Sequence, residues 1–235
     1  MSEMQFAVRW APEVLAKFPP LAICVGVIDN VRIEKENESI KSLKRSVYEE
    51  VRAKYSVETL KDNLTVRAYR DFYWRLGIDP TKIRPSGEAL LRRVLHGGEL
   101  PSISTVVDAY NLASLKTIVP ISGFDREKLN PPFQVRFAKD GETFIGIGMN
   151  KPTNLTSRML VLADERQVLS IYPYRDSDNT KITEKTRNVL VVGYGAPGIF
   201  QEQLVDAVET TLSYIKLVAN GKVEMVKIFN SKRDS

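Results

Sequence analysis

The chain has 235 residues, of which 43% are hydrophobic and 27% charged, and its net charge is +5. These values are typical of a globular chain with a substantial core and exclude fibrous and low-complexity classes. No apolar run reaches the ~20 residues of a membrane helix, and the first residues lack a secretory pattern, so we expect a cytoplasmic protein without membrane contact. The only cysteine is Cys24 and the only histidine is His96, so an internal disulfide is impossible, and we expect no metal and no other cofactor.

The first third of the chain predicts two strands followed by two helices. Residues 5–10 are expected to form a short strand, and residues 21–29 are an apolar, β-branched run typical of a buried strand. Residues 39–57 place apolar side chains every three or four positions, which predicts an amphipathic helix with lysine and arginine on its other face. A further helix is expected over residues 64–76, with its tyrosines packed into the core.

Glycine and proline divide residues 69–125 into three short helices. The second of these is expected to have Ser86 as its N-cap and to stop at Gly97 and Gly98, at least one of which should have a positive φ. The third is expected to have Ser102 as its N-cap.

The second half of the chain changes to short β-branched runs separated by turns. The expected strands cover residues 133–138, 143–148, 159–164, 167–172 and 189–194. A helix over residues 199–219 and a last strand over residues 222–229 follow. This order predicts an α+β fold, with a helical N-terminal half packed on a mixed or antiparallel sheet. We expect a single domain over residues 1–235, whose first and last strands could pair.

Positive charge is concentrated in the helical half. Residues 39–96 carry thirteen lysines and arginines against seven acidic residues, and this surplus of six accounts for the whole net charge. Such a surface suits a polyanion such as RNA, although ordinary solvation of helices by basic side chains leaves the same pattern. The candidate RNA-binding residues are Lys41, Lys44, Arg45, Arg52, Arg84, Arg92 and Arg93.

Two polar groups of residues could line a site for an aminoacyl ester. The group in the helical half contains Arg84, Ser86, Arg92, Arg93, Asp108 and Asn111. The group between two predicted strands contains Arg175, Asp176, Ser177, Asp178, Asn179 and Thr180. Arginine can bind a phosphate or carboxylate through two parallel bonds, while Asp, Ser and Thr can hold an amino or hydroxyl group. The alternative interpretations are helix capping with interhelical salt bridges for the first group, and a solvated loop for the second.

The chain also resembles a known protein family along seven runs, which are RPSGEALLRR, GGELPSI, VVDAYN, GFDREKL, VRFAKDGETF, VLADE and ITEKTRNVLVV. In their order and spacing they resemble the editing (B3/B4) domain of the phenylalanyl-tRNA synthetase β subunit, and more closely the stand-alone relatives of that domain. The resemblance covers residues 69–194. It implies a B3/B4-like fold, tRNA or aminoacyl-tRNA as the partner, and hydrolysis of a wrongly attached amino acid without a metal or a covalent nucleophile.

The resemblance further implies where the substrate would bind. The editing pocket of the family lies between the strand-rich part and the segment leading into a Phe-Asp motif. The family's histidine two residues before that motif falls on Ser122, and the glutamate that closes a later strand falls on Val192. In the family this pocket removes tyrosine that is wrongly attached to the phenylalanine tRNA. Both recognition groups are replaced here, and because Val192 lacks the polar group suited to a tyrosine hydroxyl, tyrosine is not the expected target. The candidate substrate-binding residues are Asn111, Ser122, Arg175, Asp176, Ser177, Thr180 and Val192, and no catalytic residue is assigned.

Three functional hypotheses follow. The first is hydrolysis in trans of a mischarged aminoacyl-tRNA by a positioned water molecule. The second is a non-catalytic binding module for tRNA or a free amino acid. The third is a small-molecule enzyme that reuses the fold, since a fold does not determine a function. The oligomeric state is left open.

Overall fold

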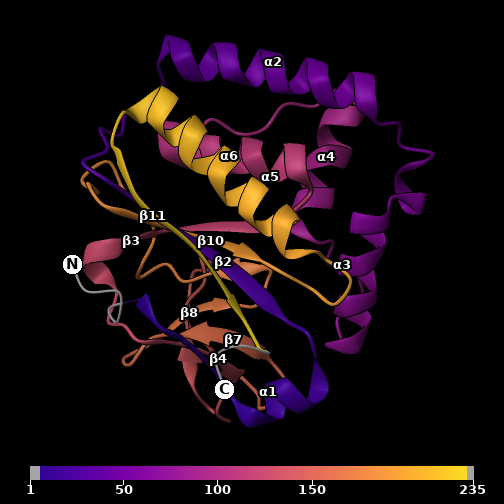
Figure 1. Cartoon of the computed structure of the whole chain (residues 1–235), viewed down its shortest axis with the longest axis vertical. Helices are drawn as coiled ribbons and strands as arrows, with labels where there is room; N and C mark the ends of the chain where they lie inside the picture. Colours follow the sequence, from indigo (N-terminus) through magenta and orange to yellow (C-terminus); the bar gives the residue numbers. More distant parts are fainter. Residues whose placement is uncertain (1–5, 232–235) are drawn as a thin grey trace.

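The computed structural model describes residues 6–231, which are arranged as a helical layer and two stacked sheets (Figure 1). The helices are α1 (Pro12–Lys17), α2 (Glu38–Lys54), α3 (Leu64–Arg75), α4 (Ser86–Leu95), α5 (Thr105–Thr117) and α6 (Gln201–Ala219), with 3-10 turns at Leu60–Asp62 and Arg126–Lys128. The strands are β1 (Val8–Trp10), β2 (Ala22–Asp29), β3 (Ile121–Asp125), β4 (Phe133–Phe137), β5 (Thr143–Phe144), β6 (Thr153–Asn154), β7 (Leu160–Ala163), β8 (Val168–Ile171), β9 (Arg175–Asp176), β10 (Val189–Tyr194) and β11 (Lys222–Asn230).

The two stacked sheets differ in strand order and direction, and β5 and β6 form a separate two-stranded antiparallel sheet. The central sheet has the order β11, β2, β10, β3, and all its neighbouring strands are antiparallel. The second sheet has the order β1, β4, β7, β8, β9, in which β1 and β4 are parallel and the other pairs antiparallel. Figure 1 shows α5 and α6 on one side of the central sheet, α2 outside these helices, and β4, β7 and β8 on the opposite side.

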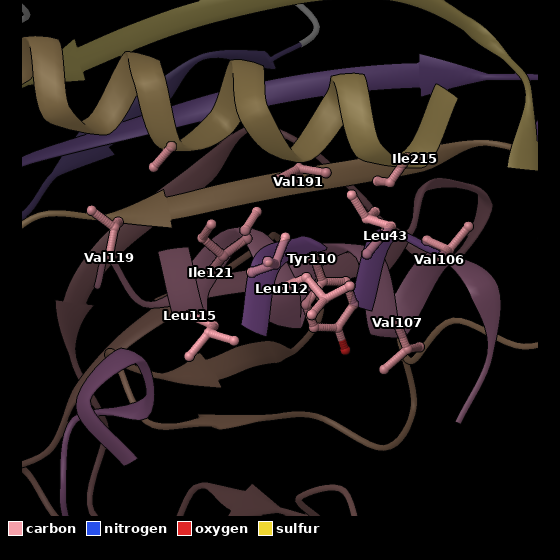
Figure 2. Packing of buried hydrophobic residues seen from close by; sticks show 14 of the residues in the cluster. Leu43, Val106, Val107, Tyr110, Leu112, Leu115, Val119, Ile121, Val191 and Ile215 are labelled. Atoms are coloured by element: carbon pink, nitrogen blue, oxygen red, sulfur yellow. The ribbon is translucent and has the colours of Figure 1, made fainter. Parts of the chain in front are cut away.

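The two inner strands of the central sheet, β2 and β10, are buried on both faces. In β2, Cys24 and Ile28 pack with the helices, whereas Ile23 and Val25 pack in the cluster shared with the second sheet. Figure 2 shows the helical face, where Val191 and other strand residues meet the apolar side chains of α5 and α6. Burial on both faces explains why β2 and β10 are continuous apolar runs without the alternation of a half-exposed strand.

The predicted α+β class is confirmed, and so are the helices with the clearest apolar periodicity, α2, α3 and α6. Tyr69 and Tyr73 of α3 are fully buried, as their spacing predicts. Gly97 follows the end of α4 with φ of 83°, which confirms the predicted left-handed exit from this helix. Within residues 6–231, no helix is both long enough and apolar enough to cross a membrane.

The predicted N-caps of two helices are wrong by one or two positions. Ser86 is the first residue inside α4 and caps nothing with its side chain. The N-cap of α5 is Ser104, whose side chain accepts a hydrogen bond from the Val107 backbone N–H. Ser102 instead accepts a hydrogen bond from the Lys44 ammonium at 2.8 Å, because this serine lies beside α2.

Three predictions about strands also need correction. The terminal strands do not pair with each other, since β1 pairs with β4 and β11 with β2. The strand expected over residues 143–148 is reduced to the two residues of β5, and Gly148 has a left-handed backbone with φ of 81°. β3 was not predicted, and its five buried residues include two with small side chains, Ser122 and Gly123.

Candidate active site between the two sheets

The two positions marked by the family resemblance lie side by side in the central sheet. Ser122 of β3 pairs directly with Val192 of β10 in the antiparallel register. Opposite residues of such a pair point to the same face, and Val192 belongs to the apolar cluster between the sheets. Ser122 is only 5% exposed. Ser122 therefore places a small polar group beside the apolar side chain of Val192. Both side chains are directed toward the second sheet.

Asp176 meets this pair from the edge of the second sheet. Its β-strand partner is Ser170 of β8, and its backbone carbonyl accepts a hydrogen bond from the Ile147 N–H at 2.9 Å. The Ser122 Oγ donates a hydrogen bond of 2.6 Å to the Asp176 Oδ1. This bond joins residues 54 positions apart and connects the two sheets at their β3 and β9 edges.

The environment of Asp176 favours its neutral form. Burial raises the pKa of Asp176 from 3.8 to about 7, and the hydrogen bond from Ser122 acts in the opposite direction. Nearby Tyr194 shares a hydrogen bond of 2.7 Å with Ser170, and burial raises the pKa of Tyr194 far above its ordinary value. Within residues 6–231, Asp176 forms no ion pair. A carboxyl group in this setting can exchange a proton near neutral pH.

Arg175 points away from Asp176, as neighbouring residues of a strand do. Its side chain is exposed, and its Nη1 donates to the Ile147 carbonyl at 3.2 Å. Gly146 makes this arrangement possible, because a Cβ there would lie 2.5 Å from the Arg175 Cδ. Gly146 and Ile147 were not predicted as neighbours of the site. The paired glycines in residues 146–148 were the available signal for a loop that allows such a close approach.

The other predicted residues of this loop have more local contacts. Ser177 is buried, and its Oγ accepts a hydrogen bond from the Asn179 N–H at 3.3 Å. The Thr180 backbone carbonyl accepts a hydrogen bond from the Asp125 N–H, and its buried Oγ1 has no hydrogen-bond partner among the described residues. Asn111 lies partly exposed on α5. The structure thus brings Ser122, Val192 and Asp176 together, with Arg175 beside them. The substrate-binding role of the whole set stays a prediction.

Several of the predicted RNA-binding cations have partners within the protein. Arg92 and Arg70 both bind Glu88, whose side chain is fully buried, at 2.6 and 2.5 Å. Lys44 binds the buried Asp108 at 2.6 Å. These contacts agree with the alternative interpretation of the first polar group as interhelical salt bridges.

The remaining predicted RNA-binding cations are not bound to buried carboxylates among the described residues. Lys41 pairs at the surface with Glu36 and Glu38, while the Nε atoms of Arg52 and Arg93 donate to backbone carbonyls. Arg45 and Arg84 are exposed and form no ion pair with any described residue. RNA binding by these residues stays a prediction.

The chain is similar in sequence to a known protein family. The family model of the B3/4 domain matches residues 68–214, which is more than half of the chain. The phenylalanine–tRNA ligase beta subunit of Photorhabdus laumondii is 31% identical over 101 residues, which cover 43% of this chain and 13% of that protein. The same subunit of Synechocystis is 26% identical over 186 residues, which cover 76% of this chain and 23% of that protein.

A solved structure is also similar. It is an N-terminal fragment of the phenylalanyl-tRNA synthetase beta subunit from Pyrococcus horikoshii, with a TM-score of 0.49 and 16% identity, covering 95% of this chain and 52% of that one. The curated relatives are much longer than the region they share with this chain, which spans less than a quarter of either.

The fold places the chain among α+β domains in which a helical layer covers one of two stacked sheets. The chain belongs to the B3/4 domain family.

Proposed function

We propose that this chain is a cytoplasmic editing domain, formed by residues 1–235 as one unit, that hydrolyses a mischarged aminoacyl-tRNA in trans. The observation that carries this proposal is the 2.6 Å hydrogen bond from Ser122 to Asp176, next to the side chain of Val192. An editing site needs a few directional polar groups on an apolar wall, and this group of residues has that character. Membership of the B3/4 family supports the choice of an aminoacyl ester as the substrate.

Exposed arginines could hold the RNA part of this substrate. Arg175 is next to the polar pair along the chain, and its guanidinium group is exposed and not neutralised by a described carboxylate. It is suited to a phosphate at the acceptor end of tRNA. Arg45 of α2 and Arg84, just before α4, are exposed cations that could bind phosphates farther along the same RNA.

The proposal can be tested with a panel of tRNAs that each carry a wrong amino acid. Native protein is expected to release the amino acid from at least one member, and Arg175→Ala is expected to weaken binding of that substrate. The control is Asp206→Asn, because Asp206 is an exposed residue of α6 and lies outside the candidate site. Release of no amino acid from any member would contradict the proposal.

The second candidate is a binding module for tRNA or a free amino acid. It is favoured by the replacement of the family's histidine and glutamate by Ser122 and Val192. Saturable binding of uncharged tRNA or of one amino acid, without deacylation of any panel member, would support it.

A further inference from the structure

We propose that Asp176 is the general base of this site and activates the water molecule that hydrolyses the ester. This inference rests on the proposed function. It assigns a catalytic role to Asp176, which the sequence predicts only as a substrate-binding residue. Ser122 is a positioning residue in this proposal, because it holds the carboxyl group without reacting itself.

The geometry leaves one oxygen of Asp176 available for a water molecule. Oδ1 accepts the hydrogen bond from Ser122, whereas Oδ2 accepts none from any described residue. Asp176 as a whole residue is partly exposed, and its Oδ2 is not among the fully buried oxygens that lack a hydrogen-bond partner, so a water molecule can reach this atom. Its backbone is held on both sides, by pairing with Ser170 and by the hydrogen bond from the Ile147 N–H. A base must be held in this way to direct its lone pair at one point.

The charged and titratable groups around Asp176 come from three elements and do not neutralise it. Tyr194 of β10 and Tyr110 of α5 lie close enough to interact with the Asp176 charge, and burial raises the pKa of both tyrosines, so each is neutral at physiological pH. Arg175 of β9 donates to the Ile147 carbonyl. Farther along the loop, Asp178 pairs with Lys181 at 2.8 Å.

Because no described cation forms an ion pair with Asp176, its largely buried carboxylate stays basic. The raised pKa of Asp176, about 7, lets this group accept a proton at neutral pH more readily than an ordinary aspartate. An aspartate in an ion pair would have the opposite tendency.

In the proposed step, Asp176 acts as a general base for the attack of water on the ester. The Asp176 Oδ2 takes a proton from a water molecule while the water oxygen forms a bond to the ester carbonyl carbon, whose π electrons move to the carbonyl oxygen. When the tetrahedral intermediate collapses, the bond between that carbon and the ribose oxygen breaks. The proton on Asp176 passes to the ribose oxygen. The products are the free amino acid and tRNA, and the carboxylate is regenerated.

The test uses native protein, Asp176→Asn, Ser122→Ala and Asp206→Asn with the panel member that native protein cleaves fastest. The rate constant and KM are measured from about pH 5.5 to pH 8.5. The Asp176→Asn variant is expected to lower the rate constant about 10²–10⁴-fold with little change in KM, because it loses a base and keeps a side chain of the same shape. Asp206→Asn makes the same change of a carboxyl to an amide at an exposed position of α6, outside the candidate site, and is expected to stay close to native.

The pH profile separates a base from a structural role. The native rate constant is expected to rise with pH and to level off above an inflection near 7. Ser122→Ala removes the hydrogen bond that favours the charged carboxylate, so its inflection should move to higher pH.

Two outcomes would overturn the base assignment while deacylation itself stands. One is an Asp176→Asn rate constant within tenfold of native, and the other is a native profile without an inflection between pH 6 and pH 8. Failure of native protein to cleave any panel member would overturn the proposed function and the base assignment together.

Discussion

At the scale of single residues, Asp176 should lower the stability of the folded chain at neutral pH. Its pKa is about 7 when folded and close to 3.8 when unfolded. Between these values the unfolded chain releases the proton first, so the free energy of unfolding falls as pH rises and stays reduced above pH 7. Below about pH 4 both states are protonated and the effect vanishes.

We therefore expect Asp176→Asn to be more stable than native at pH 8, by on the order of 2–4 kcal/mol, and nearly equal to native at pH 4. The amide cannot ionise, and it can still accept the hydrogen bond from Ser122. Urea unfolding at both pH values measures the difference, with Asp178→Asn as the control. Equal stabilities of native protein and Asp176→Asn at pH 8 would contradict the buried, unpaired carboxylate.

Glu88 should behave in the opposite way. Burial disfavours its charged form, but hydrogen bonds from Arg70 and Arg92 outweigh that effect, and the pKa of Glu88 is lowered. A lowered pKa gives stability that is present above the unfolded value of 4.5 and is lost as pH falls through the folded value. Glu88 thus contributes at neutral pH and not in acid.

Glu88→Gln is expected to lower the free energy of unfolding at pH 7 by about 2–4 kcal/mol, because it leaves two arginines without their buried carboxylate. The matched control is Glu50→Gln, since Glu50 pairs with Lys116 at the surface and should contribute less than about 1 kcal/mol. Chemical unfolding at pH 7 and pH 3 checks both variants. An equal effect of the two substitutions at pH 7 would show that the buried ion pairs of Glu88 stabilise the fold no more than the surface ion pair of Glu50.

At the scale of elements, the contact between α4 and α5 depends on the absence of a side chain at Gly87. A Cβ at this position would lie 2.3 Å from the carbonyl oxygen of Ile118, which ends α5 with φ of 64°. Backbone atoms cannot move aside as a flexible side chain can. The two helices could accept a methyl group here only by separating.

Gly87→Ala is expected to destabilise the protein by about 2–4 kcal/mol through overpacking. The intrinsic helix preference acts in the opposite direction, since alanine is favoured over glycine by about 1 kcal/mol inside a helix. The exposed Ala89 of the same helix provides the reciprocal control, and Ala89→Gly should cost only about 1 kcal/mol. Thermal or urea unfolding measures the stability of both variants. A gain of stability in Gly87→Ala would contradict the close contact between the helices.

At the scale of the whole molecule, the distribution of charge should determine how tRNA binding depends on salt. Arg45 is an exposed cation of α2, and Lys41 of the same helix forms only surface ion pairs. Each phosphate contact that is lost should reduce the slope of log affinity against log salt by about 0.7–0.9. We expect Lys41→Ala with Arg45→Ala to reduce this slope by about one to two units.

The control is Lys222→Ala with Lys227→Ala, which removes the same charge from β11 at the far edge of the central sheet. This control is expected to leave the slope close to native. Fluorescence titration with one tRNA over a range of salt concentrations measures both double variants. Equal slopes for the two would place the RNA elsewhere than on α2.

Local patterns in the sequence were sufficient for much of the fold. The apolar spacing of α2, α3 and α6 and the unbroken run of β2 could be recognised without tertiary information, because each element must bury one or both of its faces. The left-handed exit at Gly97 was also predictable, since glycine lacks the Cβ that disfavours positive φ. β3 could not be predicted from local patterns, because Ser122 and Gly123 interrupt its apolar character.

The chain by itself therefore determined its class, its longest elements and the residue types available for a site. Only the tertiary structure decided which of them meet. The bond between Ser122 and Asp176 depends on the register of β3 with β10 and of β8 with β9, and no short stretch of sequence encodes that register. Likewise, the sequence predicts Lys44 as a free cation, whereas in the folded chain it forms an ion pair with Asp108. Burial and partners determine the charge that a side chain presents, and both arise from residues far apart in the chain.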